Sequence, residues 1–146
     1  MVDSTYDTPA VIAQLNKILE AELSGVVKYT HYSLMVFGYN RIPIIGWLRD
    51  QASESLAHAH QAGELVTHLE GHPSLAIGPL LETHKHDLNG ILKESLEHEQ
   101  NAASLYKELF DLVEGKSILL EEYARDMVAK EELHIGEVIK MLRVPV

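Results

Sequence analysis

Apolar residues recur at steps of three and four positions through four long segments of this chain, which is the spacing of one face of an α-helix. The first predicted helix begins near Thr8, a capping residue type, and Pro9, a residue favoured in the first turn. It ends around 38–41, and the other three run from Pro43 to the 71–73 turn, from about Thr83 to Gly115, and from Ser117 to near Pro145. Strand-type alternation is absent, so the pattern predicts an all-α protein.

The connections between the predicted helices indicate how they are arranged. The first and last connections are short, so each pair of helices should form an antiparallel hairpin. The middle connector, residues 72–82, reaches at most roughly 36–40 Å when extended. A helix of the predicted length spans roughly 42 Å. We therefore expect one domain over residues 1–146, a four-helix bundle in which a long crossover joins two hairpins.

Charge and composition exclude several classes of protein. The formal net charge of −10 argues against nucleic acid and anionic membrane surfaces as partners, and is compatible with attraction of cations. The sequence has no cysteine, which excludes zinc–thiolate and iron–sulfur sites and fits a reducing cytoplasm. The first residues lack the features of a secretory signal, and no apolar run reaches the roughly 20 residues of a membrane span. We expect a cytoplasmic location.

Ionisable residues interrupt the apolar stripes at matching places. Glu22 and Glu99 lie within the stripes of the first and third helices, and each precedes a tyrosine by seven positions. His58 follows Glu22 by 36 positions, and His134 follows Glu99 by 35. Glu131 lies three residues before His134, so both project from one face of the fourth helix. The two hairpins therefore place similar chemical groups at similar depths in the bundle.

Buried carboxylates need a positive partner, because an isolated buried charge costs several kcal/mol. Carboxylate and imidazole ligands together suit iron and manganese first, with zinc possible. One glutamate from each of two helices, combined with Glu-x-x-His motifs, is the arrangement of di-iron carboxylate bundles.

The motifs that carry this spacing resemble the ferritin-like superfamily, and bacterioferritin most closely. They are the 15–23 segment LNKILEAEL with Tyr29, His58-Ala59, the 69–73 turn LEGHP, Glu99 with Tyr106, and the 131–134 segment EELH. The resemblance covers almost the whole chain. It implies a di-iron site within one subunit, at which iron(II) is oxidised by O2 or peroxide for storage or detoxification. It also implies metal ligands at Glu22, His58, Glu99, Glu131 and His134, with Glu22, Glu99 and Glu131 catalytic and Glu131 bridging two ions.

The sequence departs from the bacterioferritin pattern in the second helix. The family's glutamate three residues before the histidine is replaced by Ser55. Glu54 is displaced by one position and would need a bulged helix to serve as a ligand. Either Glu54 completes the metal site, or the site is asymmetric or mononuclear.

Two other departures concern haem and assembly. The methionine that binds haem in bacterioferritins is replaced by Leu56, which cannot ligate iron, so no haem is expected. The short fifth helix used in 24-subunit shells has no counterpart after the fourth helix, so a 24-subunit shell is not expected. We still expect a homo-oligomer that is at least a dimer.

The remaining polar residues have plainer interpretations. Tyr29 and Tyr106 should pack in the core, with a hydroxyl directed at a ligand carboxylate. His60, His84, His86 and His98 are expected on the surface, where His84 and His86 could bind adventitious metal. Two other functions stay open: a different di-metal oxidase or peroxidase on the same fold, and a non-catalytic helical dimer with a degenerate site.

Overall fold

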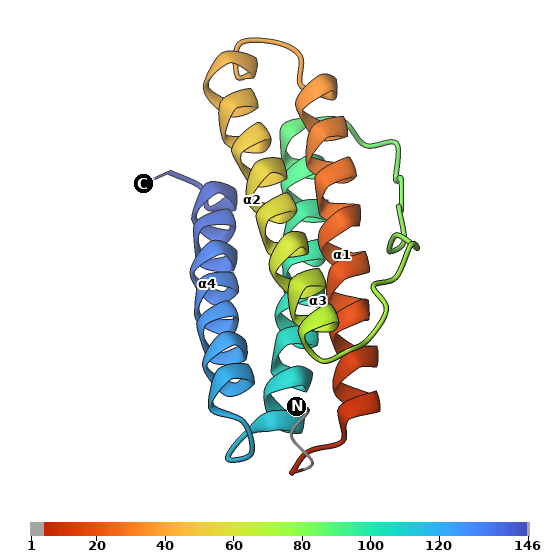
Figure 1. Cartoon of the computed structure of the whole chain (residues 1–146). Helices are drawn as coiled ribbons and strands as arrows, with labels where there is room; N and C mark the ends of the chain where they lie inside the picture. The colour runs from red at the N-terminus through yellow and green to blue at the C-terminus, as the bar shows by residue number, and fades with distance from the viewer. Residues whose placement is uncertain (1–4, 146) are drawn as a thin grey trace.

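The structure, a computed structural model, describes residues 5–145, and within them it contains four α-helices and no strand. The helices are α1 (Thr8–Met35), α2 (Arg41–His68), α3 (Leu88–Val113) and α4 (Ile118–Leu142). Figure 1 shows α1 and α2 as one antiparallel hairpin and α3 and α4 as another, with the crossover passing outside α1. The predicted four-helix bundle with a long crossover is confirmed. No helix in the described part of the chain combines the length and apolar character needed to span a membrane.

Side-chain caps fix where three of the helices begin. The carboxylate of Asp7 accepts a hydrogen bond from Ala10 N, so Asp7 rather than Thr8 caps α1. Ser117 caps α4 as predicted, with its hydroxyl accepting from Leu120 N. Asp87 caps α3, so the prediction that this helix begins near Thr83 is wrong by about one turn.

The later start of α3 lengthens the crossover to residues 69–87. This segment lies against α1 through polar contacts. Gly78 N donates to the Glu20 carbonyl at 2.9 Å, and Ser74 N donates to the Asn16 side chain at 2.8 Å. A Cβ at Gly78 would stand 3.1 Å from that same carbonyl, so the close approach of the two backbones favours glycine.

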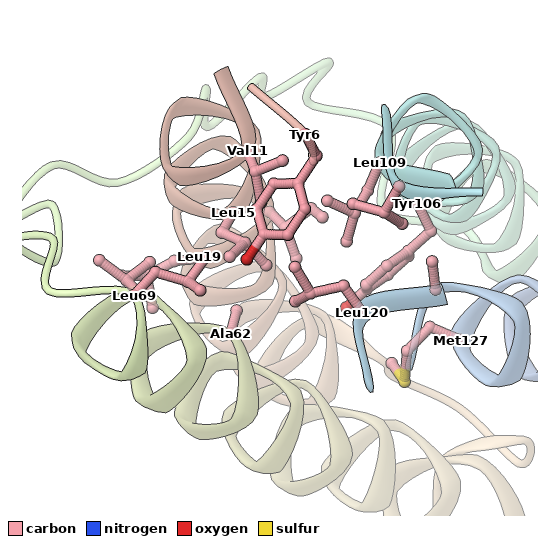
Figure 2. Packing of buried hydrophobic residues seen from close by; sticks show 14 of the residues in the cluster. Tyr6, Val11, Leu15, Leu19, Ala62, Leu69, Tyr106, Leu109, Leu120 and Met127 are labelled. Atoms are coloured by element: carbon pink, nitrogen blue, oxygen red, sulfur yellow. The ribbon is translucent and has the colours of Figure 1, made fainter. Parts of the chain in front are cut away.

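Two apolar clusters occupy the two ends of the bundle. The larger one contains Leu15 and Leu19 of α1, Ala62 of α2, Leu109 of α3 and Met127 of α4 (Figure 2). The smaller one gathers buried residues near the α1–α2 turn: Tyr29, Tyr32, Val36, Leu48, Ala52 and Ile91. Between the two apolar groups, each helix that contributes to both carries buried polar residues: Glu22 and Ser24 in α1, Ser55 and His58 in α2, and Ser95, His98 and Glu99 in α3. The bundle therefore carries a polar layer between two apolar clusters.

Candidate metal centre

The polar layer contains three carboxylates and two imidazoles, contributed by all four helices. Glu22, Glu99 and Glu131 are 2, 4 and 3% exposed, and His58 is 8% exposed. His134 is half-buried. All five residues were predicted from the sequence to face the core, and the structure brings them together there.

The first group of potential ligands consists of Glu22, His58 and Glu131. His58 Nδ1 lies 2.7 Å from Glu22 Oε2 and 3.9 Å from Glu131 Oε1. Burial raises the pKa of Glu22, and the adjacent imidazole of His58 opposes this effect only in part. A cation between these groups would replace the proton that burial favours.

The second group consists of Glu99, Glu131 and His134. His134 Nδ1 lies 3.3 Å from Glu99 Oε2, and the Tyr29 hydroxyl donates to Glu99 Oε1. Ser95 Oγ lies 2.8 Å from the same hydroxyl. The prediction that Tyr29 packs in the core and reaches a carboxylate is thus confirmed. Tyr106 is also fully buried, with its ring centroid 6.1 Å from that of Tyr123.

Glu131 belongs to both groups, and it is electrostatically unlike its neighbour. Burial and the nearby carboxylate of Glu99 raise the pKa of Glu131 far above its usual range. Burial also acts to raise the pKa of Glu99, but hydrogen bonds with Glu131 and His134 outweigh it and lower that pKa. At neutral pH one carboxyl is therefore protonated and donates to the other, which relieves part of the repulsion within the layer.

Several buried polar atoms of this layer lack a hydrogen-bond partner. They include Glu131 Oε2 and His134 Nε2. Carboxylate oxygens and imidazole nitrogens are ligands for iron, manganese and zinc. The donor set and these atoms fit a metal ion held between the helices, because coordination would satisfy lone pairs that are otherwise buried without a partner.

The bacterioferritin pattern has a glutamate three residues before the histidine of α2, and here the buried hydroxyl of Ser55 occupies that position. Ser55 is 6% exposed, whereas the side chain of Glu54 is 53% exposed. Glu54 Oε1 lies 3.8 Å from His58 Nε2, on the opposite side of the ring from the nitrogen that faces Glu22. Helix α2 is continuous and contains no π-turn, so Glu54 is not rotated into the layer. Its role as a ligand stays a prediction.

His98 was expected on the surface, and that prediction is wrong. It is 6% exposed and faces a narrow gap at Gly25, where a Cβ would stand 2.8 Å from both His98 Nε2 and Ser55 Oγ. These two polar atoms are consequently no more than 5.6 Å apart. Gly25 lies at a core-facing position of α1, opposite Ser55 of α2. Two small residues that face each other leave room for a large side chain from α3, and this was the sequence signal for burial of His98. His60, by contrast, is exposed as predicted.

The indole of Trp47 borders the layer. Its ring centroid lies 5.9 Å from that of His134 and 6.4 Å from that of Tyr29, in tilted and edge-to-face arrangements. The half-buried indole thus covers the end of the layer nearest the α1–α2 turn.

Together the fold and the buried cluster define the class of helical bundles that hold metal ions between their helices. The family model of the ferritin-like domain, described as Ferritin, matches residues 12–144, so the chain belongs to the ferritin-like family. That family and the carboxylate–histidine cluster support an iron-binding role. No curated protein sequence is detectably similar to the chain.

Solved structures share this fold over nearly the whole chain. A ferritin-like, diiron-carboxylate protein of Bacillus anthracis has a TM-score of 0.88 and 22% identity, covering 94% of this chain and 98% of its own. The bacterioferritin-related protein of Bacteroides fragilis, a dodecameric thioferritin, has a TM-score of 0.87 and 25% identity, and the match covers 94% of this chain and 87% of that protein. Rhodobacter capsulatus bacterioferritin, with a metal-free dinuclear site and haem iron, has a TM-score of 0.83 and 24% identity, and the match covers 92% of this chain and 84% of that protein.

Proposed function

We propose that this chain binds iron(II) in the polar layer and oxidises it with O2 or peroxide, for storage or detoxification of iron. The observation that supports the proposal most strongly is the position of Glu131. It belongs to two overlapping groups of three ligands, one completed by Glu22 and His58 and the other by Glu99 and His134. A carboxylate shared by two groups is suited to bridge two ions.

The residues of the layer have separable tasks in this proposal. Glu22 and His58 would bind one iron ion and Glu99 and His134 the other, with Glu131 between them. Two iron(II) ions supply the two electrons that reduce O2, with two protons, to hydrogen peroxide. When hydrogen peroxide is the oxidant instead, two iron(II) ions supply two electrons that reduce it, with two protons, to two molecules of water. Carboxylate and imidazole ligands suit this task because they bind iron in both oxidation states.

The hydroxyl of Tyr29 would position the second group. It donates to one oxygen of Glu99 while His134 approaches the other, so this carboxylate is held from both sides. Such support fixes the orientation of a ligand and adjusts its basicity. Tyr29 is therefore a positioning residue in this proposal.

The experiment that tests the function is an anaerobic titration with iron(II) followed by exposure to air. We expect about two irons bound per chain, followed by a rise in ferric absorbance. The variant E131Q should bind iron weakly and oxidise it slowly, whereas E132Q, which changes the exposed neighbouring residue, should behave as the parent does. Binding of no more than a trace of iron by the parent would refute the proposal.

A second candidate is a helical assembly with a degenerate metal site, and Ser55 favours it. A hydroxyl is a weak ligand compared with the carboxylate that the bacterioferritin pattern has at this position. The two candidates differ in one measurement. A protein whose melting temperature is unchanged by saturating manganese or iron(II) has no site of useful affinity, because tight binding to the folded state must stabilise it.

We also propose that the chain forms a homo-oligomer. The related Bacteroides fragilis protein is dodecameric. Large apolar side chains are exposed at and near the α1–α2 turn: Phe37 is 73%, Tyr39 104% and Ile42 85% exposed. Exposed apolar residues grouped in this way are typical of surfaces that bind other protein chains. Sedimentation of the purified protein measures its assembly state directly.

A further inference from the structure

A third group of potential metal ligands lies outside the polar layer, where the crossover meets α1. His31 of α1 and Glu82 and His86 of the crossover each direct one ligand atom to a common point, with all three atoms within 4.8 Å of one another. His31 follows Glu22 by nine positions along α1, or about 14 Å of helix. This group is therefore separate from the buried cluster.

The distances within the group resemble those between ligands of one metal ion. His31 Nε2 lies 2.7 Å from Glu82 Oε2, and His86 Nε2 lies 3.3 Å from Glu82 Oε1. The ring centroids of the two histidines are 5.9 Å apart. Two ligand atoms of a tetrahedral zinc ion, each about 2.0–2.2 Å from the metal, are roughly 3.4 Å apart. Small side-chain movements suffice to bring these three atoms to such distances.

Glu82 is held in place by the backbone. The N–H of His84 donates to Glu82 Oε1 at 2.6 Å, and His84 itself adopts the left-handed conformation, with φ of 58°. This hydrogen bond, together with the two nearby imidazoles, lowers the pKa of Glu82 to about 2. The carboxylate is therefore oriented before any ligand arrives, which reduces the ordering that binding requires.

The crossover is itself attached to the bundle beside this group. The Thr83 hydroxyl donates to Glu94 Oε2 of α3 at 2.5 Å. A cavity of about 160 Å³ adjoins the group and is lined by His31, Glu82, Leu80 and Leu81, among others. The three ligands are half-buried or partly exposed, so an ion from solvent can reach them and water can fill the remaining coordination positions.

We propose that His31, Glu82 and His86 form a second metal site, which takes a divalent transition metal of the zinc type. Two imidazoles and one carboxylate are the ligands of known zinc sites that keep a further position open. Oxygen ligands alone would favour magnesium or calcium, whereas two nitrogen ligands favour zinc, iron(II) or copper(II). Bound metal would join the crossover to α1 through ligands 51 and 55 positions away from His31 in the sequence.

The test uses the full chain and zinc alone. Crystals are soaked in zinc chloride, and anomalous scattering is measured at the zinc edge for the parent and for the variants H31Q, H86Q and H60Q. The last of these replaces an exposed histidine of α2 outside the group, so it is the matched control. Zinc affinity is measured in solution by calorimetry on the same four proteins, with circular dichroism to show that each is folded.

We expect an anomalous peak between His31 Nε2 and His86 Nε2 in the parent and in H60Q. In H31Q and H86Q this peak should be absent, while any zinc in the polar layer remains. The affinity of this site for zinc should fall at least tenfold in both variants. The proposal is overturned if the parent shows no peak there, if the peak persists in both variants, or if it requires a ligand from a neighbouring molecule. None of these outcomes depends on iron oxidation, so this site and the proposed function can fail independently.

Discussion

Replacing Glu131 with glutamine should stabilise the metal-free protein while abolishing its response to metal. Burial and Glu99 raise the pKa of Glu131 from its usual 4.5 to above neutrality. At pH 7 the folded chain therefore retains a proton that the unfolded chain releases. Over the 2.5 units between 4.5 and 7, at about 1.36 kcal/mol per unit, this opposes folding by up to about 3.4 kcal/mol.

Glutamine has nearly the same shape and never ionises, so E131Q avoids that cost. The pKa of Glu131 is raised in the folded state, so its contribution to stability is fully present below pH 4.5 and is lost as the pH rises. The advantage of E131Q should accordingly be about 3 kcal/mol at pH 7 and should vanish as the pH falls to 4.5. In the parent, metal at 100 times its dissociation constant should add about 2.7 kcal/mol, and E131Q should lose this gain.

The assay is urea unfolding at pH 7 and pH 4.5, with a chelator and then with saturating manganese. Glu132 is the matched control, because it is exposed on the same helix and its Oε1 lies 3.4 Å from Lys107 Nζ. E132Q should change the free energy of unfolding by no more than about 0.5 kcal/mol in any condition. The reasoning is refuted if metal-free E131Q is less stable than the parent at pH 7, or if it keeps the stabilisation by manganese.

Three further substitutions, one of them with a matched control, test side chains that border the polar layer. S55E supplies the missing carboxylate and should raise the affinity for iron(II) at least tenfold in competition with a chelator; unchanged affinity contradicts the proposed role of this position. Y29F removes the hydroxyl that donates to Glu99 and should lower the free energy of unfolding by about 1–3 kcal/mol; no loss on urea unfolding would mean that this bond is not stabilising. G25A and G136A both gain up to about 1 kcal/mol of helix propensity, but only at Gly25 does the added Cβ meet atoms at 2.8 Å. G25A should therefore be less stable than G136A by about 1–3 kcal/mol. Equal stability would show that His98 and Ser55 move aside without lowering the free energy of unfolding.

The helices and the five core ligands were predictable because both depend on periodicity. Glu22 and Glu131 interrupt apolar stripes whose phase is set by many other residues, so their direction follows from the pattern alone. The bounds of α3 were less certain, since Thr83 and Asp87 are both capping residue types. The apolar stripe begins at Leu88, and the hydroxyl of Thr83 bonds to Glu94 instead of capping the helix.

Two features could not be obtained from periodicity. His98 lies directly before a core residue of α3, and only the gap left by Gly25 on the opposite helix allows its ring to be buried. The group of His31, Glu82 and His86 depends on the path of the crossover, which has no periodicity. Its shape is determined by individual contacts, such as the one between the backbone of His84 and Glu82.

The place of Trp47 beside His134 gives the protein an intrinsic optical reporter. It is the only tryptophan of the sequence, so all indole emission comes from one ring at the edge of the polar layer. Protonation of His134, or metal binding to it, would change the charge on a ring whose centroid lies 5.9 Å from that of the indole. Its fluorescence should therefore follow the filling of the layer in real time, without a label and without interference from any other indole in the chain.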